Sequence, residues 1–584
     1  MSKVIGKVTR VSGPVVESDG APNAFMLEMA EVGPDHLVGE VVHLEGDRAT
    51  IQVYEDTTGL SPGAEVYGSG RPLSLELGPG LIGAIFDGIQ RPLETIRKTM
   101  GRYIRKGVHL PPLPRDKFWE FTPLLAEGSE VRGGEILGTV PETPLIVHKI
   151  LIPPETVGKL VTVAPAGAYR LEDTVAVVAG ERGETEVKLL QVWPIRRRRP
   201  YLQKLPLTEL LLTGQRVLDT LFPVAKGGVV AVPGGFGTGK TLIQHQIAKW
   251  CDAQVIIFIG CGERGNEMTD VLLNFPKLID PLSGRPLLER TIFVANTSNM
   301  PVAAREASIY TGITLAEYYR DMGYHVAVMA DSTSRWAEAL RELSGRMEEM
   351  PADEGFPAYL PTRLAEFYER GGMVSTLSGG VGSVSIIGSV SPPGGDFSEP
   401  VTQHTKRFVR AFWALDRELA NARHYPAVSW TDSYSEYLAE MAAWWTKHID
   451  PAWLDLRNRM MELLQREVRL QQVVKLVGPD VLPDSQRLIL ETCALFKDAF
   501  LQQNAFDEVD TYCAPLKQLK MLKIIVAFYD LGLEAIKGGT PLVRLKKLKV
   551  FGEILKMKFA YPNAEAGRID ELLEKLKSSI EKFT

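Results

Sequence analysis

A glycine-rich loop between an apolar strand and a helix constrains this chain more than any other feature of its sequence. The loop has the spacing G-x-x-x-x-G-K-T, follows the apolar run 229–232 and precedes a stretch of helical periodicity at 242–250. Strand, loop and helix bring backbone N–H groups and a helix N-terminus to one point, which favours a polyphosphate. A fortuitous glycine turn is the alternative, and the flanking strand and helix argue against it. The loop residues are Gly234, Gly235, Phe236, Gly237, Thr238, Gly239, Lys240 and Thr241.

The last two residues of this loop are candidate phosphate and metal ligands. In the arrangement described, the Lys240 ammonium would reach the β and γ phosphates, and the Thr241 hydroxyl would ligate Mg²⁺. The sequence therefore predicts a nucleotide site that also holds Mg²⁺.

Apolar strands alternate with helical segments from about residue 195 to 435. This alternation is typical of a parallel sheet covered by helices on both faces. Strands are expected at 229–232, 255–259, 292–295, 326–330 and 384–387.

Charged residues follow two of these strands, at the sheet edge where ligands bind in such folds. Asp331 comes directly after strand 326–330 and is the usual type of Mg²⁺ holder, acting through water; capping of the next helix is the alternative. Glu263 lies in a glycine-flanked loop after strand 255–259 and could polarise the water that attacks a γ-phosphate. The neighbouring Arg264 could neutralise γ-phosphate charge. A surface ion pair between the two is the alternative.

The regions outside the nucleotide-binding segment have different patterns. Residues 1 to about 70 alternate apolar and polar residues, which predicts a small closed barrel without the aromatic cluster of nucleic-acid-binding barrels. A strand-rich segment from about 112 to 190 resembles half of a biotinyl or lipoyl carrier barrel. Lys149 lacks the flanking residues of a modified lysine, so a structural insert is expected. Beyond about 440 the period is helical, with later helices near 488–500, 516–531 and 542–559.

Composition limits the possible partners and compartments. The net charge of −6 gives no global attraction to nucleic acid, and the run Arg196–Arg199 is expected to be a solvated linker or a contact with another chain. The four cysteines form no C-x-x-C pair, so neither a metal site nor a disulfide framework is expected, and a reducing cytosol fits. Because no apolar span is long enough for a bilayer, any membrane link is expected to go through partners.

Several motifs together resemble those of the catalytic A subunit of V-type and A-type rotary ATPases, and the resemblance covers essentially the whole chain. It implies an N-terminal β-barrel at 1–72 and a RecA-like nucleotide-binding domain at 73–111 and 191–437. It also implies an inserted β-rich bulge domain at 112–190 and a C-terminal helical bundle at 438–584. The expected fold is thus multidomain α/β. The matching motifs lie at 262–270, 296–306, 331–339, 391–396 and 502–506.

The resemblance also implies residue roles, substrate and partners. Glu263 would activate water, Arg264 would sense the γ-phosphate, Tyr425 would stack on adenine and Phe506 would flank the same base. The activity implied is hydrolysis or synthesis of Mg-ATP, with release or uptake of ADP, coupled to transport of H⁺ or Na⁺. The partners implied are non-catalytic B subunits in an A₃B₃ ring, a central stalk and peripheral stalks, in a cytoplasmic sector that meets the membrane only through the rotor.

Two loop residues depart from the family pattern. Gly235 stands where prokaryotic members of this family usually have proline, and glycine admits more backbone conformations. Thr238 stands where eukaryotic relatives have cysteine, so redox control at that position is not expected.

Three rival functions share the nucleotide-binding fold. A non-catalytic ring subunit is disfavoured because this chain keeps Lys240, Thr241 and Glu263, whereas such subunits usually lack the corresponding residues. A RecA-like nucleic-acid translocase is disfavoured by the acidic charge balance, and a protein-export ATPase by the insert at 112–190.

Overall fold

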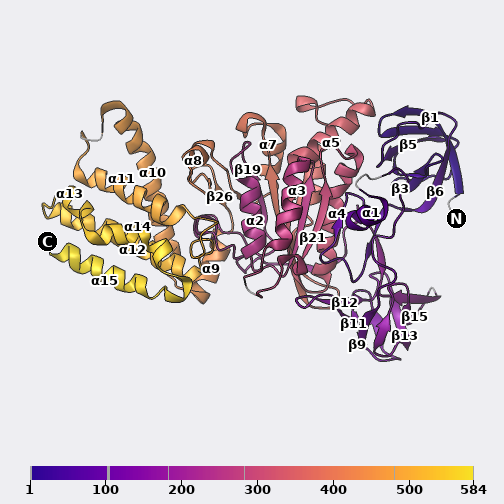
Figure 1. Cartoon of the computed structure of the whole chain (residues 1–584), viewed down its shortest axis with the longest axis horizontal. Helices are drawn as coiled ribbons and strands as arrows, with labels where there is room; N and C mark the ends of the chain where they lie inside the picture. Colours follow the sequence, from indigo (N-terminus) through magenta and orange to yellow (C-terminus); the bar gives the residue numbers. More distant parts are fainter. Residues whose placement is uncertain (1–2, 102–104, 182, 282, 479–480, 583–584) are drawn as a thin grey trace. The chain divides into compact units, whose positions relative to one another are not determined.

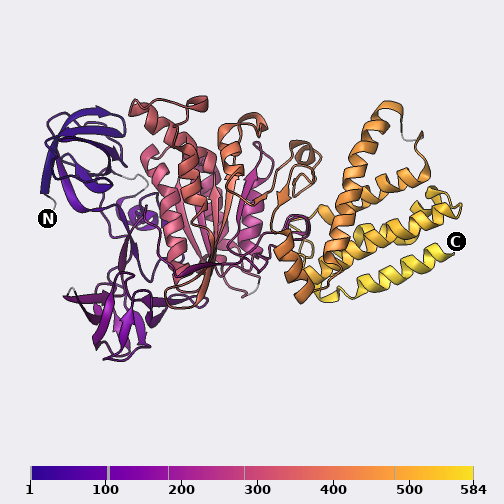
Figure 2. The ribbon, with the colours of Figure 1, turned by 180° about the vertical axis from the view of Figure 1, so that it is seen from behind.

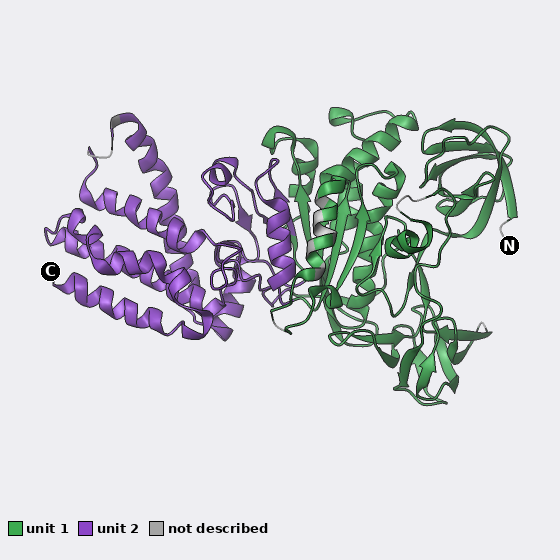
Figure 3. Ribbon diagram, viewed as in Figure 1, with its two compact units in different colours: residues 1–206, 227–229, 253–409 green, residues 207–226, 230–252, 410–584 purple. Residues whose placement is uncertain are grey.

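A computed structural model describes residues 3–101, 105–181, 183–281, 283–478 and 481–582 of the chain (Figure 1). The chain separates into two units, which are coloured in Figure 3. Unit 1 comprises residues 1–206, 227–229 and 253–409, and unit 2 comprises residues 207–226, 230–252 and 410–584.

The alternating N-terminal segment of unit 1 forms a closed antiparallel barrel, as predicted. Its strands follow the order β1-β2-β5-β4-β3-β6, so the sheet has no free edge. Val16, Val41 and Ile51 belong to the barrel core and are fully buried. The strands are β1 (Lys3–Ser12), β2 (Val15–Asp19), β3 (Glu28–Val32), β4 (Leu37–Glu45), β5 (Arg48–Val53) and β6 (Glu65–Pro72).

Two four-stranded antiparallel sheets form the inserted segment of unit 1. Their orders are β10-β13-β15-β16 and β12-β11-β9-β14. Lys149 on β12 donates a hydrogen bond of 2.6 Å to the Met322 carbonyl, so its ammonium is tied to the protein, as a structural insert requires. The strands are β9 (Trp119–Pro123), β10 (Glu130–Arg132), β11 (Ile136–Pro141), β12 (Val147–Leu151), β13 (Val157–Val163), β14 (Gly167–Tyr169), β15 (Thr174–Gly180) and β16 (Gly183–Lys188); β17 (Gln191–Pro194) pairs with β7 (Ser74–Leu77).

A parallel sheet lies at the centre of unit 1. Its parallel strands have the order β24-β22-β20-β21-β8, and β23 pairs antiparallel with β24 and with β18. Every residue of β20 is buried, which explains its continuous apolar run. The strands are β8 (Ile85–Phe86), β18 (Gln203–Leu205), β20 (Val255–Cys261), β21 (Thr291–Asn296), β22 (His325–Asp331), β23 (Gly372–Ser375) and β24 (Val381–Val390), and they include all the strands expected in this unit.

Helices cover this sheet (Figure 1). Helix α4 packs against β20, β21, β22 and β24, and nearly its whole surface is buried. The helices of unit 1 are α1 (Leu93–Met100), α3 (Gly265–Asn274), α4 (Val302–Asp321), α5 (Thr333–Arg346), α6 (Leu360–Tyr368) and α7 (Pro400–Lys406).

Unit 2 contains the predicted strand before the glycine-rich loop and the helix after it. β19 (Val229–Pro233) pairs in parallel with β25 (Ala411–Phe412), which pairs antiparallel with β26 (Tyr434–Ser435). α2 (Lys240–Trp250) begins at the loop lysine. The expected strand–loop–helix order is therefore present.

The rest of unit 2 is helical, as the period predicted (Figure 2). Helix α12 packs against α10, α11 and α15, and its residues Ile524, Ile525 and Phe528 are fully buried. The helices are α8 (Arg417–Asn421), α9 (Leu438–His448), α10 (Trp453–Val477), α11 (Asp484–Phe496), α12 (Pro515–Lys537), α13 (Leu542–Lys546), α14 (Lys549–Ala560) and α15 (Arg568–Glu581).

One helix prediction is wrong in part. The expected helix 542–559 is two helices, α13 and α14, because Leu548 is extended, with φ −62° and ψ 130°. The turn lets both short segments bury their apolar residues, among them Leu545 and Ile554.

The run Arg196–Arg199 is not a solvated linker. Arg196 forms 2.8 Å ion pairs with Glu40 of the barrel and Glu306 of α4, and all three side chains are buried or nearly so. Arg199 is buried and pairs with Asp321 at 2.6 Å. Only the two middle arginines of the run are exposed. The sequence pattern missed this because the carboxylate partners lie far away along the chain.

Three further observations concern the described residues as a whole. The fold class is confirmed as multidomain α/β, with a barrel, a β-rich insert, a parallel sheet and a helical C-terminal region. All four cysteines are buried thiols that form no disulfide bond with one another. No helix within the described ranges has the length and apolar character needed to cross a bilayer.

Candidate nucleotide site

The glycine-rich loop of unit 2 turns sharply from β19 into α2. Gly237 and Gly239 have φ of 79° and 91°, a region that favours glycine. A Cβ on Gly234 would lie 2.6 Å from the Thr238 hydroxyl, so the loop has room only for glycine there. Buried Thr238 donates a 2.8 Å hydrogen bond to the Gly235 carbonyl, which gives this departure from the family pattern a structural role.

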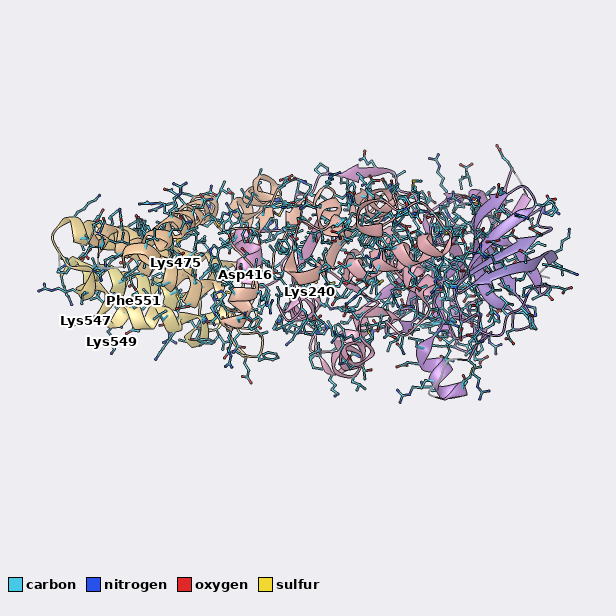
Figure 4. All side chains as sticks on the ribbon, turned by 90° about the horizontal axis from the view of Figure 1, so that it is seen from above. Lys240, Asp416, Lys475, Lys547, Lys549 and Phe551 are labelled. Carbon is cyan, nitrogen blue, oxygen red and sulfur yellow. The ribbon has the colours of Figure 1, made fainter. Side chains whose placement is uncertain are left out.

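Lys240 lies at the start of α2, where Figure 4 labels it. Its ammonium donates hydrogen bonds of 2.6 and 2.9 Å to the carbonyls of Gly234 and Gly235. The positive charge is therefore held at the loop, beside the N-terminus of the helix. Phe236 at the loop tip is 81% exposed. Thr241 is the second residue of α2.

Tyr425 lies against the same loop. A Cβ on Gly239 would be 3.4 Å from the Tyr425 ring, so the ring and the loop are close neighbours within unit 2. Tyr425 and Phe506 line one cavity of 340 Å³, and the Phe506 ring is 85% exposed. The two aromatic residues that the family resemblance assigns to one base thus line the same cavity.

Sequence reasoning assigned no role to five polar residues that line the same cavity: Arg423, Gln502, Gln503, Asn504 and Lys558. Gln502 begins the motif 502–506 of the family resemblance, so the sequence did contain a signal that could have pointed to it. Lys558 lies on α14 and had no signal, because only the fold brings that helix to the cavity.

Asp331 ends β22 in unit 1. Its side chain is buried, and one carboxylate oxygen accepts a 2.5 Å hydrogen bond from the Ser389 hydroxyl. The N-cap residue of α5 is Ser332, so Asp331 does not occupy the capping position that was its alternative role.

Glu263 follows the neighbouring strand β20. Gly262 has φ of 74°, and a Cβ on it would lie 2.6 Å from the Arg335 side chain, so the turn requires glycine. The Glu263 carbonyl accepts a 2.9 Å hydrogen bond from the Ser298 amide, which anchors the loop. Because Gly260 of β20 is the register partner of Asp331, both carboxylates belong to the same edge of the sheet. Arg264 is exposed.

The expected site residues thus form two groups. Lys240, Thr241, Tyr425 and Phe506 belong to unit 2, whereas Glu263, Arg264 and Asp331 belong to unit 1. The Thr241 hydroxyl of unit 2 and the buried Asp331 carboxylate of unit 1 are each an oxygen donor of the kind that Mg²⁺ prefers.

Family models match four segments of the chain. The nucleotide-binding domain of the ATP synthase alpha/beta family matches residues 214–435, and the beta-barrel domain of that family matches residues 8–70. The ATP synthase alpha/beta subunit barrel-sandwich domain matches residues 110–196, and the C-terminal domain of V and A type ATP synthase matches residues 442–544.

The likeness to solved structures is illustrated by one ATPase. It is the assembled ATPase EscN from the type III secretion system of enteropathogenic E. coli, which matches with a TM-score of 0.65 and 19% identity, covering 89% of this chain and 100% of that chain. At this identity the likeness concerns the fold alone.

Curated relatives match over nearly their whole length. The A subunit of the A-type ATP synthase of Methanopyrus kandleri is 58% identical, over 100% of this chain and 99% of the relative. The V-type ATP synthase alpha chain of Halothermothrix orenii is 56% identical, over 98% and 97%. The corresponding A-type protein of Thermococcus kodakarensis is 55% identical, over 99% and 100%. The chain therefore belongs to the family of A subunits, or alpha chains, of A-type and V-type ATP synthases.

Proposed function

We propose that this chain hydrolyses Mg-ATP, or synthesises it in the reverse direction, as the catalytic subunit of a rotary ATP synthase coupled to transport of H⁺ or Na⁺. The observation that carries the proposal is the phosphate loop of unit 2 with Tyr425 beside it. A helix N-terminus, a lysine held at the loop and an aromatic ring suit the phosphates and the base of one nucleotide.

The loop residues bind the phosphates in this proposal. Amides of the segment 234–241 and the Lys240 ammonium neutralise the β and γ phosphates, and Tyr425 and Phe506 enclose adenine. Thr241 would hold Mg²⁺, and Asp331 would hold it through water, as the family resemblance implies. When bound, the ion would offset charge on the phosphate oxygens.

The residues of unit 1 act on the terminal phosphate. Glu263 accepts a hydrogen bond from the attacking water and aligns it, and Arg264 offsets charge on the γ-phosphate oxygens. A glutamate in this role needs a rigid backbone, which the Gly262 turn and the Ser298 hydrogen bond provide.

The proposed assembly completes the site with a neighbouring chain. This catalytic chain alternates with non-catalytic B subunits in an A₃B₃ ring, with central and peripheral stalks, on the cytoplasmic side of a membrane. Its proposed domains are 1–72, 73–111 with 191–437, 112–190 and 438–584. An arginine from the adjacent chain would lower the barrier, and such a residue accelerates phosphoryl transfer about 10³- to 10⁵-fold.

A single substitution tests the role of Glu263. Glu263→Gln should abolish ATP turnover in the assembled ring and leave ATP affinity close to that of the wild type, because the amide keeps the shape but not the charge. Glu342→Gln is the control, since Glu342 is an exposed partner of Arg346. A large loss of affinity in Glu263→Gln would instead make Glu263 a binding residue.

The isolated chain tests the shared site. It should bind nucleotide but hydrolyse it about 10³- to 10⁵-fold more slowly than the ring, which corresponds to about 4–7 kcal/mol of activation free energy. Full-rate hydrolysis by a verified monomer would contradict the proposal.

A further inference from the structure

Lys558 lines the cavity of Tyr425 and Phe506 in unit 2, and its ammonium group uses all of its hydrogen-bond donors. Its side chain extends from α14, and the residue is 3% exposed. The ammonium donates to the Asp498 carbonyl at 2.6 Å, the Gln502 carbonyl at 3.0 Å and the Gln502 side-chain oxygen at 3.1 Å. An ammonium has three N–H donors, so donors and acceptors match.

The carboxamide of Gln502 is consequently held at both ends. Its oxygen accepts from Lys558, and its nitrogen is 3.4 Å from the Arg423 carbonyl, to which it donates. A flipped amide would place its NH₂ group against the ammonium and its oxygen against a carbonyl, which is unfavourable. The orientation of this side chain in the cavity is therefore fixed.

A fixed amide can distinguish purines. Its oxygen accepts from the 6-amino group of adenine while its nitrogen donates to a ring nitrogen, the usual pairing of glutamine with adenine. At the same edge guanine presents two acceptors, O6 and N7, so the amide oxygen held in this orientation would face O6 with no donor between them.

We propose that Lys558 is a positioning residue that makes the pocket select the 6-amino edge of adenine over the 6-oxo edge of guanine, by holding the Gln502 amide in one orientation. This inference rests on the proposed function, in which the cavity of Tyr425 and Phe506 receives the base.

The backbone around Gln502 does not depend on Lys558 alone. Arg216 donates to the Gln502 carbonyl at 2.8 Å and to the Phe500 carbonyl at 2.5 Å, and Gln503 donates to the Gly214 carbonyl at 2.9 Å. Loss of the Lys558 ammonium should therefore free the amide more than the main chain.

Deprotonation of the Lys558 ammonium should also release the Gln502 amide from its fixed orientation. A neutral amine has two donors for the three oxygens, so its lone pair would face one of them. Burial lowers the pKa of Lys558 to about 8, and burial together with Lys558 and Lys497 lowers the pKa of His424 to about 4. His424 is thus already neutral when Lys558 titrates. The charged groups that act on Lys558 are Arg216, Asp498, Asp507 and Asp510, and the titratable His424 and Lys517 are its further neighbours.

The test compares ATP and GTP binding to the full chain by calorimetry at pH 7. Lys558→Met should reduce the ratio of ATP to GTP affinity about tenfold, chiefly by weakening ATP binding. Lys558→Arg, which keeps a cation at this position, should retain part of the wild-type ratio. Gln502→Leu should have the same effect, and the double variant no further one, because both changes remove a single interaction. Lys556→Met, an exposed position on the same helix, is the matched control.

A pH series measures how the ratio of ATP to GTP affinity depends on pH, a dependence that a purely structural lysine would not produce. The ratio should fall in the wild type between about pH 7 and 9 and stay constant in Lys558→Arg, which remains charged. Equal weakening of both nucleotides, or an unchanged ratio in Gln502→Leu, would overturn the inference while leaving the proposed function intact. A wild-type chain that binds neither nucleotide would overturn the proposed function itself.

Discussion

Arg216 and Asp510 form a 2.6 Å ion pair within unit 2, and neither side chain is exposed to solvent. The second carboxylate oxygen of Asp510 accepts a 2.7 Å hydrogen bond from the Asn504 amide. One buried carboxylate thus joins an arginine near the start of unit 2 to the segment that precedes Phe506.

Arg216→Met should destabilise unit 2 by about 3–5 kcal/mol, because it leaves the Asp510 charge buried without its cation. It should also weaken nucleotide binding, since the segment 502–506 loses its anchor. Denaturant unfolding and calorimetric titration measure the two effects. The double variant with Asp510→Asn should recover part of the stability, and a double variant less stable than Arg216→Met would contradict this account.

The arginine run offers a comparison between neighbouring residues of one type. Arg196→Met should destabilise unit 1 by about 3–5 kcal/mol, because Glu40 and Glu306 would remain buried without their partner. Arg198→Met should change stability by less than about 1 kcal/mol, since Arg198 pairs with Glu369 at the surface. Denaturant unfolding of both variants measures the difference, and similar losses would refute the assignment of Arg196 as the buried anchor.

The difference between Arg196 and Arg198 illustrates which features of this protein can be predicted from local sequence patterns. The spacing of the loop 234–241 correctly predicted that Lys240 and Thr241 begin a helix, because the motif is local. Its glycines at 237 and 239 adopt positive φ angles that other residues disfavour. The strands before Glu263 and Asp331 were equally clear, since a buried parallel strand leaves a continuous apolar run. Local patterns therefore predicted the fold class and the strand ends.

Contacts between distant segments could not be read in this way. Nothing around Arg196 shows that its carboxylate partners lie in the barrel and in α4, and nothing around Lys558 shows that α14 reaches the cavity of Tyr425 and Phe506. Tyr425 was assigned to the base only through the family resemblance, because a tyrosine before proline has no helical or strand pattern that marks a ligand contact.

Stacking at the base gives a prediction for Tyr425. Tyr425→Ala should weaken ADP binding about 10- to 100-fold, in line with about 1–3 kcal/mol for an aromatic ring stacked on a base. Tyr425→Phe should bind as the wild type does, because in the proposed site the ring and not the hydroxyl contacts the base. Calorimetric titration of the full chain measures both, and an unchanged affinity in Tyr425→Ala would remove this residue from the base site.

Glu142 gives unit 1 a defined response to acid. Its carboxylate is buried and lies 2.8 Å from His148, and it accepts hydrogen bonds from the Tyr319 hydroxyl and the amides of Gly80 and Ile82. Burial raises the pKa of Glu142, but His148 and the amide hydrogen bonds outweigh burial and hold the pKa below its usual 4.5.

A carboxyl with a depressed pKa stabilises the folded state above the unfolded-state pKa, and this stability is lost as the pH falls through the folded-state pKa. The unfolding free energy of the wild type should therefore fall with acidification below about pH 4.5. Glu142→Gln should be less stable at pH 7 by about 1–3 kcal/mol, since the amide replaces a charged acceptor, and its pH dependence should be shallower. Urea unfolding between about pH 3 and 7 measures both, with exposed Glu342→Gln as the control. If Glu142→Gln keeps the wild-type slope, another carboxyl governs the acid response of unit 1.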